Sequence, residues 1–289
     1  MYRRVVCAVS AIVLLAACGG DSKNATGPDS QCTRGALTLG TVRTGAVTSG
    51  DCGFPAASEA LGKYDSYSVT LTAGQVYQVL HQATVAFDWD PYLEVLGPSG
   101  NVIAFSDDDF STYNSELFFV APTTGTYAIR AGGLDVTELG DYRLTVRACP
   151  ATQITSTAAI SGALTSGDCR TTFAPAADSS LADVFLFTST GTSRDLTVTT
   201  STFTPAFIVS GPRFAFESDL FLLSTLGSPA TATVSGPLTP GTYFVIVSAE
   251  GAITGGGSYT IQSSVASSSA RLAPPPSARP AWYRPAKGL

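Results

Sequence analysis

One eight-residue segment occurs twice in this chain, and each occurrence ends in a cysteine. GAVTSGDC covers residues 45–52, and GALTSGDC covers residues 162–169, which lie 117 positions further along. Cys32 and Cys149 keep the same spacing of 117, and each precedes the cysteine of its octet by 20 residues. A pattern repeated at this distance predicts two copies of one fold, each the size of a small domain.

The cysteine spacing also favours one disulfide pairing. Four cysteines permit three pairings, and only Cys32–Cys52 with Cys149–Cys169 lets each copy close its own bridge. A loop of about 20 residues closed in this way contributes about 3 kcal/mol in the chain-entropy model. A four-cysteine zinc site is the alternative, but structural zinc ligands usually come in closely spaced pairs, which this sequence lacks.

Further segments align between the copies, with offsets of 114 to 118 residues. The aligned segments are 65–69 with 183–187, 91–98 with 205–212, 125–127 with 241–243, and 141–144 with 258–261. Offsets that drift and recover indicate loop insertions between fixed strands. We therefore expect one domain at 32–148 and a second at 149–265.

The local pattern in both copies is that of β-strands. Tyr67, Val69 and Leu71 alternate with polar residues, and the same alternation returns at 142–146 and 243–247. Turn signals rich in glycine and proline separate these segments, and none of them has a helical period. We predict an all-β fold of two tandem antiparallel β-sandwich domains, jelly-roll-like, with about eight strands each.

The N-terminal segment is typical of an exported protein. Arg3 and Arg4 precede an apolar run at 5–17 that is too short to span a membrane but fits a signal peptide. The run ends in Leu15-Ala16-Ala17-Cys18, which resembles the bacterial lipobox. That resemblance implies cleavage before Cys18 and lipidation of its thiol; an ordinary secretory signal is the alternative.

We accordingly expect a lipoprotein signal peptide at 1–17 and a flexible tether at 18–31. Several acyl chains on one residue would anchor the protein firmly, and Gly19, rather than an aspartate, after the cysteine favours the outer membrane or the cell surface. The lipid is then the only expected contact with the membrane, since no later segment is apolar for long enough to cross it.

Loss of the signal leaves 14 of the 16 basic residues against 22 acidic ones. The folded part has no basic patch, so nucleic acid is not an expected partner. The segment 266–289 is rich in proline, serine and alanine, contains four basic residues and no acidic one, and is expected to be disordered.

The first copy resembles a known bacterial module. It contains, in order, KYDSYSVTLTAGQVYQV (63–79), FDWDPYLEVLGPSGNVIAFSDDD (87–109), FFVAPTTGTYAIRAGG (118–133) and GDYRLTV (140–146). This succession resembles the pre-peptidase C-terminal (PPC) domain, a β-sandwich appended to many secreted peptidases. The second copy keeps PGTYFVIV (240–247) but has Thr204 in place of Asp90 and no aspartate triplet, so it is a degenerate copy.

The sequence offers little from which an active site could be built. His81 is its single histidine, four cysteines are expected in disulfides, and no hydrolase, zinc-peptidase or nucleotide-binding motif occurs. His81 continues the alternation of Tyr77 and Val79, which predicts a strand histidine rather than a general base. We expect no enzymatic activity and no required cofactor.

An acidic and aromatic segment of the first copy is the best candidate for a ligand site. Its residues flank a predicted turn: Asp88, Trp89, Asp90, Tyr92, Asp107, Asp108 and Asp109. One interpretation is a calcium site, because calcium prefers oxygen ligands. A second is a face on which rings stack against sugar or peptide. The third is a solvated turn with locally packed rings.

The function predicted from these features is that of a non-catalytic, lipid-anchored cell-envelope protein. Its β-sandwich domains would bind an extracellular polysaccharide or a protein. The alternative, implied by the PPC resemblance, is an accessory module that assists a separately encoded secreted peptidase.

Overall fold

A computed structural model describes residues 32–85, 88–107, 113–171, 180–191, 193–210, 220–223, 230–237, 240–249 and 257–265. All regular structure in these ranges is β-strand, which confirms the predicted all-β class. A helix long and apolar enough to span a membrane is not found in them. The expected signal peptide, Cys18, the tether and the tail at 266–289 lie outside the described residues.

The first domain has two facing sheets. Its strands are β1 (Thr33–Ala36), β2 (Arg43–Val47), β3 (Cys52–Gly53), β4 (Lys63–Leu71), β5 (Val76–Ala83), β6 (Pro91–Leu96), β7 (Val102–Ser106), β8 (Ser115–Val120), β9 (Gly125–Gly133) and β10 (Gly140–Cys149). One sheet has the order β1-β4-β9-β6-β7, with β3 beside β4, and the other has the order β2-β10-β5-β8.

The second domain repeats this topology strand for strand. Its strands are β11 (Ala151–Ile154), β12 (Ile160–Ala163), β13 (Cys169–Thr171), β14 (Ser180–Ser189), β15 (Ser193–Thr200), β16 (Pro205–Ser210), β17 (Leu220–Leu223), β18 (Ala230–Pro237), β19 (Gly241–Ala249) and β20 (Ser258–Val265). The sheet orders are β11-β14-β19-β16-β17, with β13 beside β14, and β12-β20-β15-β18. Each strand thus takes the place of the strand numbered ten lower.

Two features of the sandwiches differ from the prediction. The pairs β1–β4 and β11–β14 are parallel, because the chain crosses to the opposite sheet after the first strand and returns before the fourth. The short strands β1 and β3 also raise the strand number above eight. They carry little apolar alternation, so their sequence does not distinguish them from loops.

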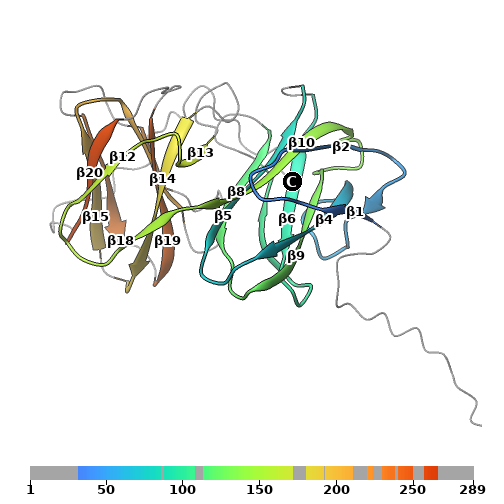
Figure 1. Cartoon of the computed structure of the whole chain (residues 1–289), viewed down its shortest axis with the longest axis horizontal. Helices are drawn as coiled ribbons and strands as arrows, with labels where there is room; N and C mark the ends of the chain where they lie inside the picture. Colours follow the sequence, from blue (N-terminus) through green and yellow to red (C-terminus); the bar gives the residue numbers. More distant parts are fainter. Residues whose placement is uncertain are drawn as a thin grey trace, which may run out of the picture.

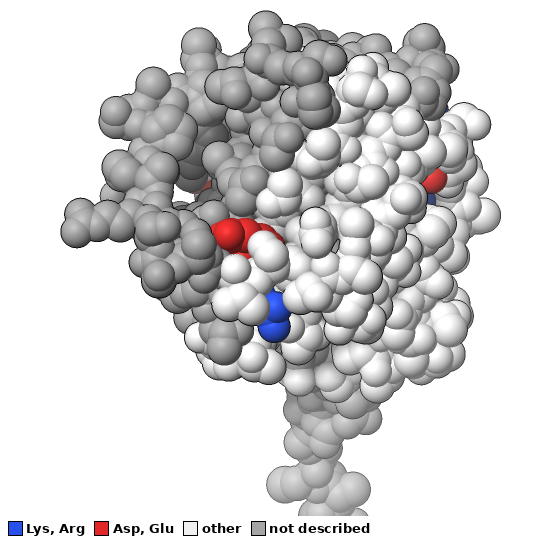
Figure 2. All heavy atoms as spheres, turned by 90° about the vertical axis from the view of Figure 1, so that its left-hand side faces the viewer, with Lys and Arg blue, Asp and Glu red and all other residues white. Residues whose placement is uncertain are grey.

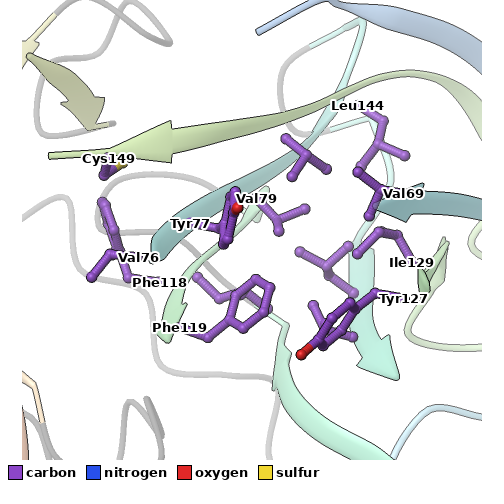
Figure 3. Packing of buried hydrophobic residues seen from close by; sticks show 14 of the residues in the cluster. Val69, Val76, Tyr77, Val79, Phe118, Phe119, Tyr127, Ile129, Leu144 and Cys149 are labelled. Atoms are coloured by element: carbon purple, nitrogen blue, oxygen red, sulfur yellow. The ribbon is translucent and has the colours of Figure 1, made fainter. Parts of the chain in front are cut away.

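The core of the first domain lies between its two sheets. Tyr67, Val69 and Ile129 point inward from one sheet, and Val79 and Leu144 point inward from the other, each at most 2% exposed. Figure 3 shows this packing, with the rings of Phe119 and Tyr127 side by side and their centroids 6.3 Å apart. Burial of each large side chain stabilises the fold by about 1.5–3 kcal/mol, so the alternation read from the sequence carries much of the folding energy.

Both predicted disulfides are present, as Cys32–Cys52 and Cys149–Cys169, with Cα–Cα distances of 5.9 and 5.5 Å. The second bridge also secures the junction between the domains. Cys149 is the last residue of β10, whereas Cys169 opens β13 in the second domain. Since β11 begins at Ala151, two residues after β10 ends, the domains have no flexible linker between them.

The two sandwiches are stacked face to face. Figure 1 shows β5 and β8 of the first domain turned toward β14 and β19 of the second. Ala182, Val184 and Ile246 of the second domain belong to the same hydrophobic cluster as the first core. On the facing sheet, Leu80 and Phe118 are at most 1% exposed, so the outer face of β2-β10-β5-β8 is an interdomain contact surface.

A buried polar group fixes the register of this contact. The Glu116 carboxylate, which is fully buried, accepts hydrogen bonds from the Gln78 amide and, at 3.3 Å, from the Thr171 hydroxyl. The same Gln78 amide also donates to the carbonyl oxygen of Arg170. Gln78 and Glu116 come from the first domain and Arg170 and Thr171 from the second. A shift of one sheet over the other would therefore break the two hydrogen bonds that cross between the domains.

Candidate functional site

The repeated octet has a structural role in both copies. A side chain at Gly45 would overlap with the ring of Tyr142, and one at Gly162 would overlap with the ring of Tyr259. Asp51 accepts hydrogen bonds from the backbone N–H of Thr48 at 2.6 Å and from its hydroxyl at 2.9 Å. Asp168 and Thr165 repeat this turn in the second copy. The octet therefore builds a strand end and a turn, and it is not a duplicated active site.

In the first copy, the octet aspartate belongs to a charged network. Arg34 pairs with Asp51 and, through Nε at 2.6 Å, with Asp65. The Tyr142 hydroxyl donates to Asp65 at 2.6 Å, and burial together with this bond raises the pKa of Tyr142 well above its usual value. The Tyr67 hydroxyl lies 2.6 Å from that of Tyr142. Every charge in the network has an opposite partner, which indicates a structural role.

The second copy has the same carboxylates without the arginine. Tyr259 donates to Asp183, as Tyr142 does to Asp65. The segment 150–153, which follows Cys149 as Thr33 to Ala36 follow Cys32, contains no basic residue. Burial, with a contribution from the negative charge of Asp168, raises the pKa of Asp183 to about 6.

This difference predicts opposite effects of one substitution in the two copies. Asp183→Asn should raise the free energy of unfolding at pH 7.5 by about 1 kcal/mol, after allowing for solvent screening, because an amide still accepts from Tyr259 without the cost of ionisation. Asp65→Asn should lower it by about 1–2 kcal/mol, because it breaks the ion pair with Arg34. Urea unfolding of both variants measures the two values.

The pH dependence provides the control. The pKa of Asp183 in the folded protein lies above its ordinary value of 3.8, so this group contributes stability that falls as the pH rises from about 4 to 6. The gain from Asp183→Asn should therefore vanish at pH 4. A gain of equal size at pH 4 and pH 7.5 would contradict this assignment.

Among the described residues of the acidic and aromatic segment, Trp89, Asp90 and Tyr92 are buried and present no aromatic face to solvent. They are 4%, 5% and 1% exposed, respectively. The Trp89 ring packs edge-on against the His81 ring, with their centroids 5.6 Å apart. The Tyr92 ring packs edge-on against the Phe54 ring, with their centroids 5.3 Å apart. Both rings are thus used within the fold: Tyr92 lies in β6 and Trp89 in the bend before it, and each packs against neighbouring side chains rather than pointing toward solvent.

The remaining aspartates of this segment are dispersed. Asp88 is exposed and Asp107 is half-buried, while Asp108 and Asp109 lie outside the described residues. Among the described residues, no group of three or more His, Cys, Asp or Glu side chains is arranged to hold a metal ion. Calcium binding therefore stays a prediction that depends on Asp108 and Asp109.

His81 is placed where it cannot act as a general base on a substrate. Its ring is fully buried, and Nδ1 lies 3.2 Å from the carbonyl oxygen of Tyr92, which can only accept a hydrogen bond. Nδ1 is therefore the protonated nitrogen, and Nε2 has no hydrogen-bond partner within the described structure. Burial lowers the pKa of His81 to about 3, so the ring is neutral at physiological pH.

A buried ion pair that sequence reasoning missed lies on the outer face of β4-β9-β6. Arg130 Nη1 donates to Glu94 at 3.0 Å, and the Ser58 hydroxyl donates to the same carboxylate at 2.6 Å. The guanidinium of Arg130 lies over the Tyr64 ring, 5.0 Å from its centroid. The loop carrying Ser58 and Phe54 covers this face, so the cluster holds a loop onto the sheet.

The outer face of the corresponding sheet in the second domain is apolar instead. Ile246 takes the sheet position of Arg130, and Ala182 takes that of Tyr64. The exchange follows from the stacking of the domains, because this face of β14 and β19 packs against the first domain, where an unpaired charge would be costly.

The outer face of β12-β20-β15-β18 lies at the free end of the second domain, and its side chains are mostly hydroxyls. Six of its described residues, which we term the hydroxyl face, are Ser161, Thr197, Thr199, Thr260, Gln262 and Ser264, while Ala163, Asp195 and Ser258 alternate onto the same side. Of the six, Ser161, Thr260 and Gln262 are exposed and the other three are half-buried. Figure 2 looks onto this side of the molecule, where most of the described atoms are uncharged and acidic and basic side chains are visible near the middle of the view.

The sequence matches no family model and no curated protein. Among solved structures, the chain is similar to the pre-peptidase C-terminal domain of collagenase from Bacillus anthracis, with 20% identity, 41% of this chain and 98% of that chain covered, and a TM-score of 0.29. It is also similar to the CUB1-EGF-CUB2 domains of rat MASP-1, with 8% identity, 80% and 99% covered, and a TM-score of 0.21. At these TM-scores, neither similarity assigns the chain to a family.

Proposed function

We propose that this chain is a non-catalytic, lipid-anchored protein of the cell envelope whose paired β-sandwiches bind an extracellular polysaccharide or protein. The proposal rests on a comparison of the same outer sheet face in the two domains. The face of β2-β10-β5-β8 binds an entire second domain, and the corresponding face of that domain carries the exposed hydroxyl face.

Further observations support the absence of catalysis and the export of the chain. The single histidine is buried and neutral, and all four cysteines between residues 32 and 169 are in disulfides. Disulfides of this kind form in oxidising compartments. The Leu15-Ala16-Ala17-Cys18 segment supports a lipid anchor at Cys18 and a position at the outer membrane or the cell surface.

Binding to a glycan array, together with pull-down from the native envelope, tests this function for the purified full chain. We expect a reproducible polysaccharide or protein ligand and no hydrolysis of it. Absence of any ligand in both assays would overturn the proposal. The alternative of an accessory module for a secreted peptidase rests on the PPC resemblance at 63–146, and co-purification of a peptidase from the native membrane would favour it.

A further inference from the structure

The hydroxyl face is ordered in two dimensions. Strand register places Ser161 beside Thr260 and Thr260 beside Thr199, so that one row crosses three strands. A second row pairs Gln262 with Thr197. Neighbouring strands are about 4.8 Å apart, and residues two positions apart on one strand are separated by about 6.7 Å. The alternate residues of these strands point into the core, as Leu196, Val198 and Ile261 show by their burial.

The same face of the first domain shows how this fold uses it. Thr197 takes the sheet position of Leu80, and Thr260 and Ser264 take those of Arg143 and Arg147. In the first domain, that face packs against the second domain, and Leu80 is 1% exposed on it. At the corresponding positions, the second domain therefore has hydroxyl side chains in place of one leucine and two arginines.

These replacements restrict the chemistry of a ligand. Protein interfaces are enriched in aromatic and arginine anchors, and none of the six residues of the hydroxyl face is of either type. Binding of an anionic polymer would rely on arginine or lysine, which are likewise missing from the six. Asp195, opposite Ser264, alternates onto the same side as the six, and its carboxylate would repel an anionic polymer.

From these observations we infer that the hydroxyl face binds a neutral polysaccharide, an inference that rests on the binding function proposed above. Hydroxyl and amide side chains both donate and accept hydrogen bonds, as sugar hydroxyls do. Threonine side chains have few rotamers to lose on binding. A repeating array also suits a repeating ligand, because many weak contacts act together along one polymer chain.

Cosedimentation of the full chain with insoluble cellulose and chitin, with alginate gel as the anionic comparison, tests this inference. The informative variant is Thr199→Val with Thr260→Val, which removes two neighbouring hydroxyls from the hydroxyl face while keeping the side-chain shape. The matched control is Thr70→Val with Thr126→Val, an exposed cross-strand pair on the other domain. Melting temperatures of both variants check that they are folded.

We expect the wild-type chain to bind cellulose or chitin, the control pair to bind equally well, and the Thr199/Thr260 pair to bind about tenfold more weakly, as loss of about two hydrogen bonds implies. Undiminished binding by the Thr199/Thr260 pair would overturn the inference while leaving the proposed function intact. Binding to alginate alone, or to a captured protein alone, would also overturn it. Absence of every ligand would overturn the proposed function itself.

Discussion

Replacement of Arg130 by methionine is expected to lower the free energy of unfolding by about 3–5 kcal/mol. The guanidinium is largely buried, with its side chain 11% exposed, and its partner Glu94 is 2% exposed. Methionine fills a similar volume but leaves the Glu94 carboxylate buried with the Ser58 hydroxyl as its remaining described donor. Urea unfolding at pH 7 measures the loss.

Two comparison variants separate charge pairing from simple loss of an arginine. Arg43 also lies over a tyrosine ring, 5.8 Å from the centroid of Tyr67, but it is exposed, so Arg43→Met should cost about 1 kcal/mol or less. The double variant Arg130→Met/Glu94→Gln should recover most of the stability, because no unpaired charge then stays buried. Equal losses for Arg43→Met and Arg130→Met would contradict the assigned role of the buried pair.

Acidification should destabilise the first domain through His81. The pKa of this ring is about 3 in the folded protein and about 6.5 when unfolded, so the unfolded chain binds the extra proton first. The contribution is fully present above pH 6.5 and declines as the pH falls toward 3, by about 4 kcal/mol in total. The physical reason is that a protonated Nε2 would be buried with no described acceptor.

The comparison of wild type with His81→Phe isolates this contribution. Stability measured by urea unfolding between pH 7 and pH 3.5 should fall more steeply for the wild type than for the variant, whatever the variant costs at pH 7. Asp183 acts in the opposite direction over part of this range, but it does so in both proteins and cancels in the difference. Parallel stability curves would show that His81 is not the titrating group.

Short-range patterns were sufficient to predict the class of fold. Alternation at Tyr67, Val69 and Leu71 follows directly from a strand with one buried face, and the spacing of the four cysteines identified both disulfides. The parallel pairing of β1 with β4 could not be predicted, because strand direction depends on which sheet the chain enters between them. Burial of the outward-facing Phe118 likewise depends on the second domain.

The candidate site was harder to predict for a related reason. Trp89, Asp90 and Tyr92 attract attention by composition, yet whether such residues face solvent or the protein depends on strand register and loop placement, which sequence spacing does not contain. Thr199 and Thr260 are ordinary residues of two strands far apart in the sequence, and only the pairing of β15 with β20 makes them neighbours. Because strand pairing brings these residues together from separate parts of the chain, no short sequence motif marks the face that they form.

The most direct test of the binding account is a titration of the full chain, labelled at its threonine methyl groups, with chitohexaose and cellohexaose, followed by NMR. The signals that shift should be those of Thr197, Thr199 and Thr260, while those of Thr70 and Thr126 should stay in place. Shifts confined to Thr84 and Thr137, which lie on exposed loops of the first domain, would contradict it and place the ligand away from the hydroxyl face.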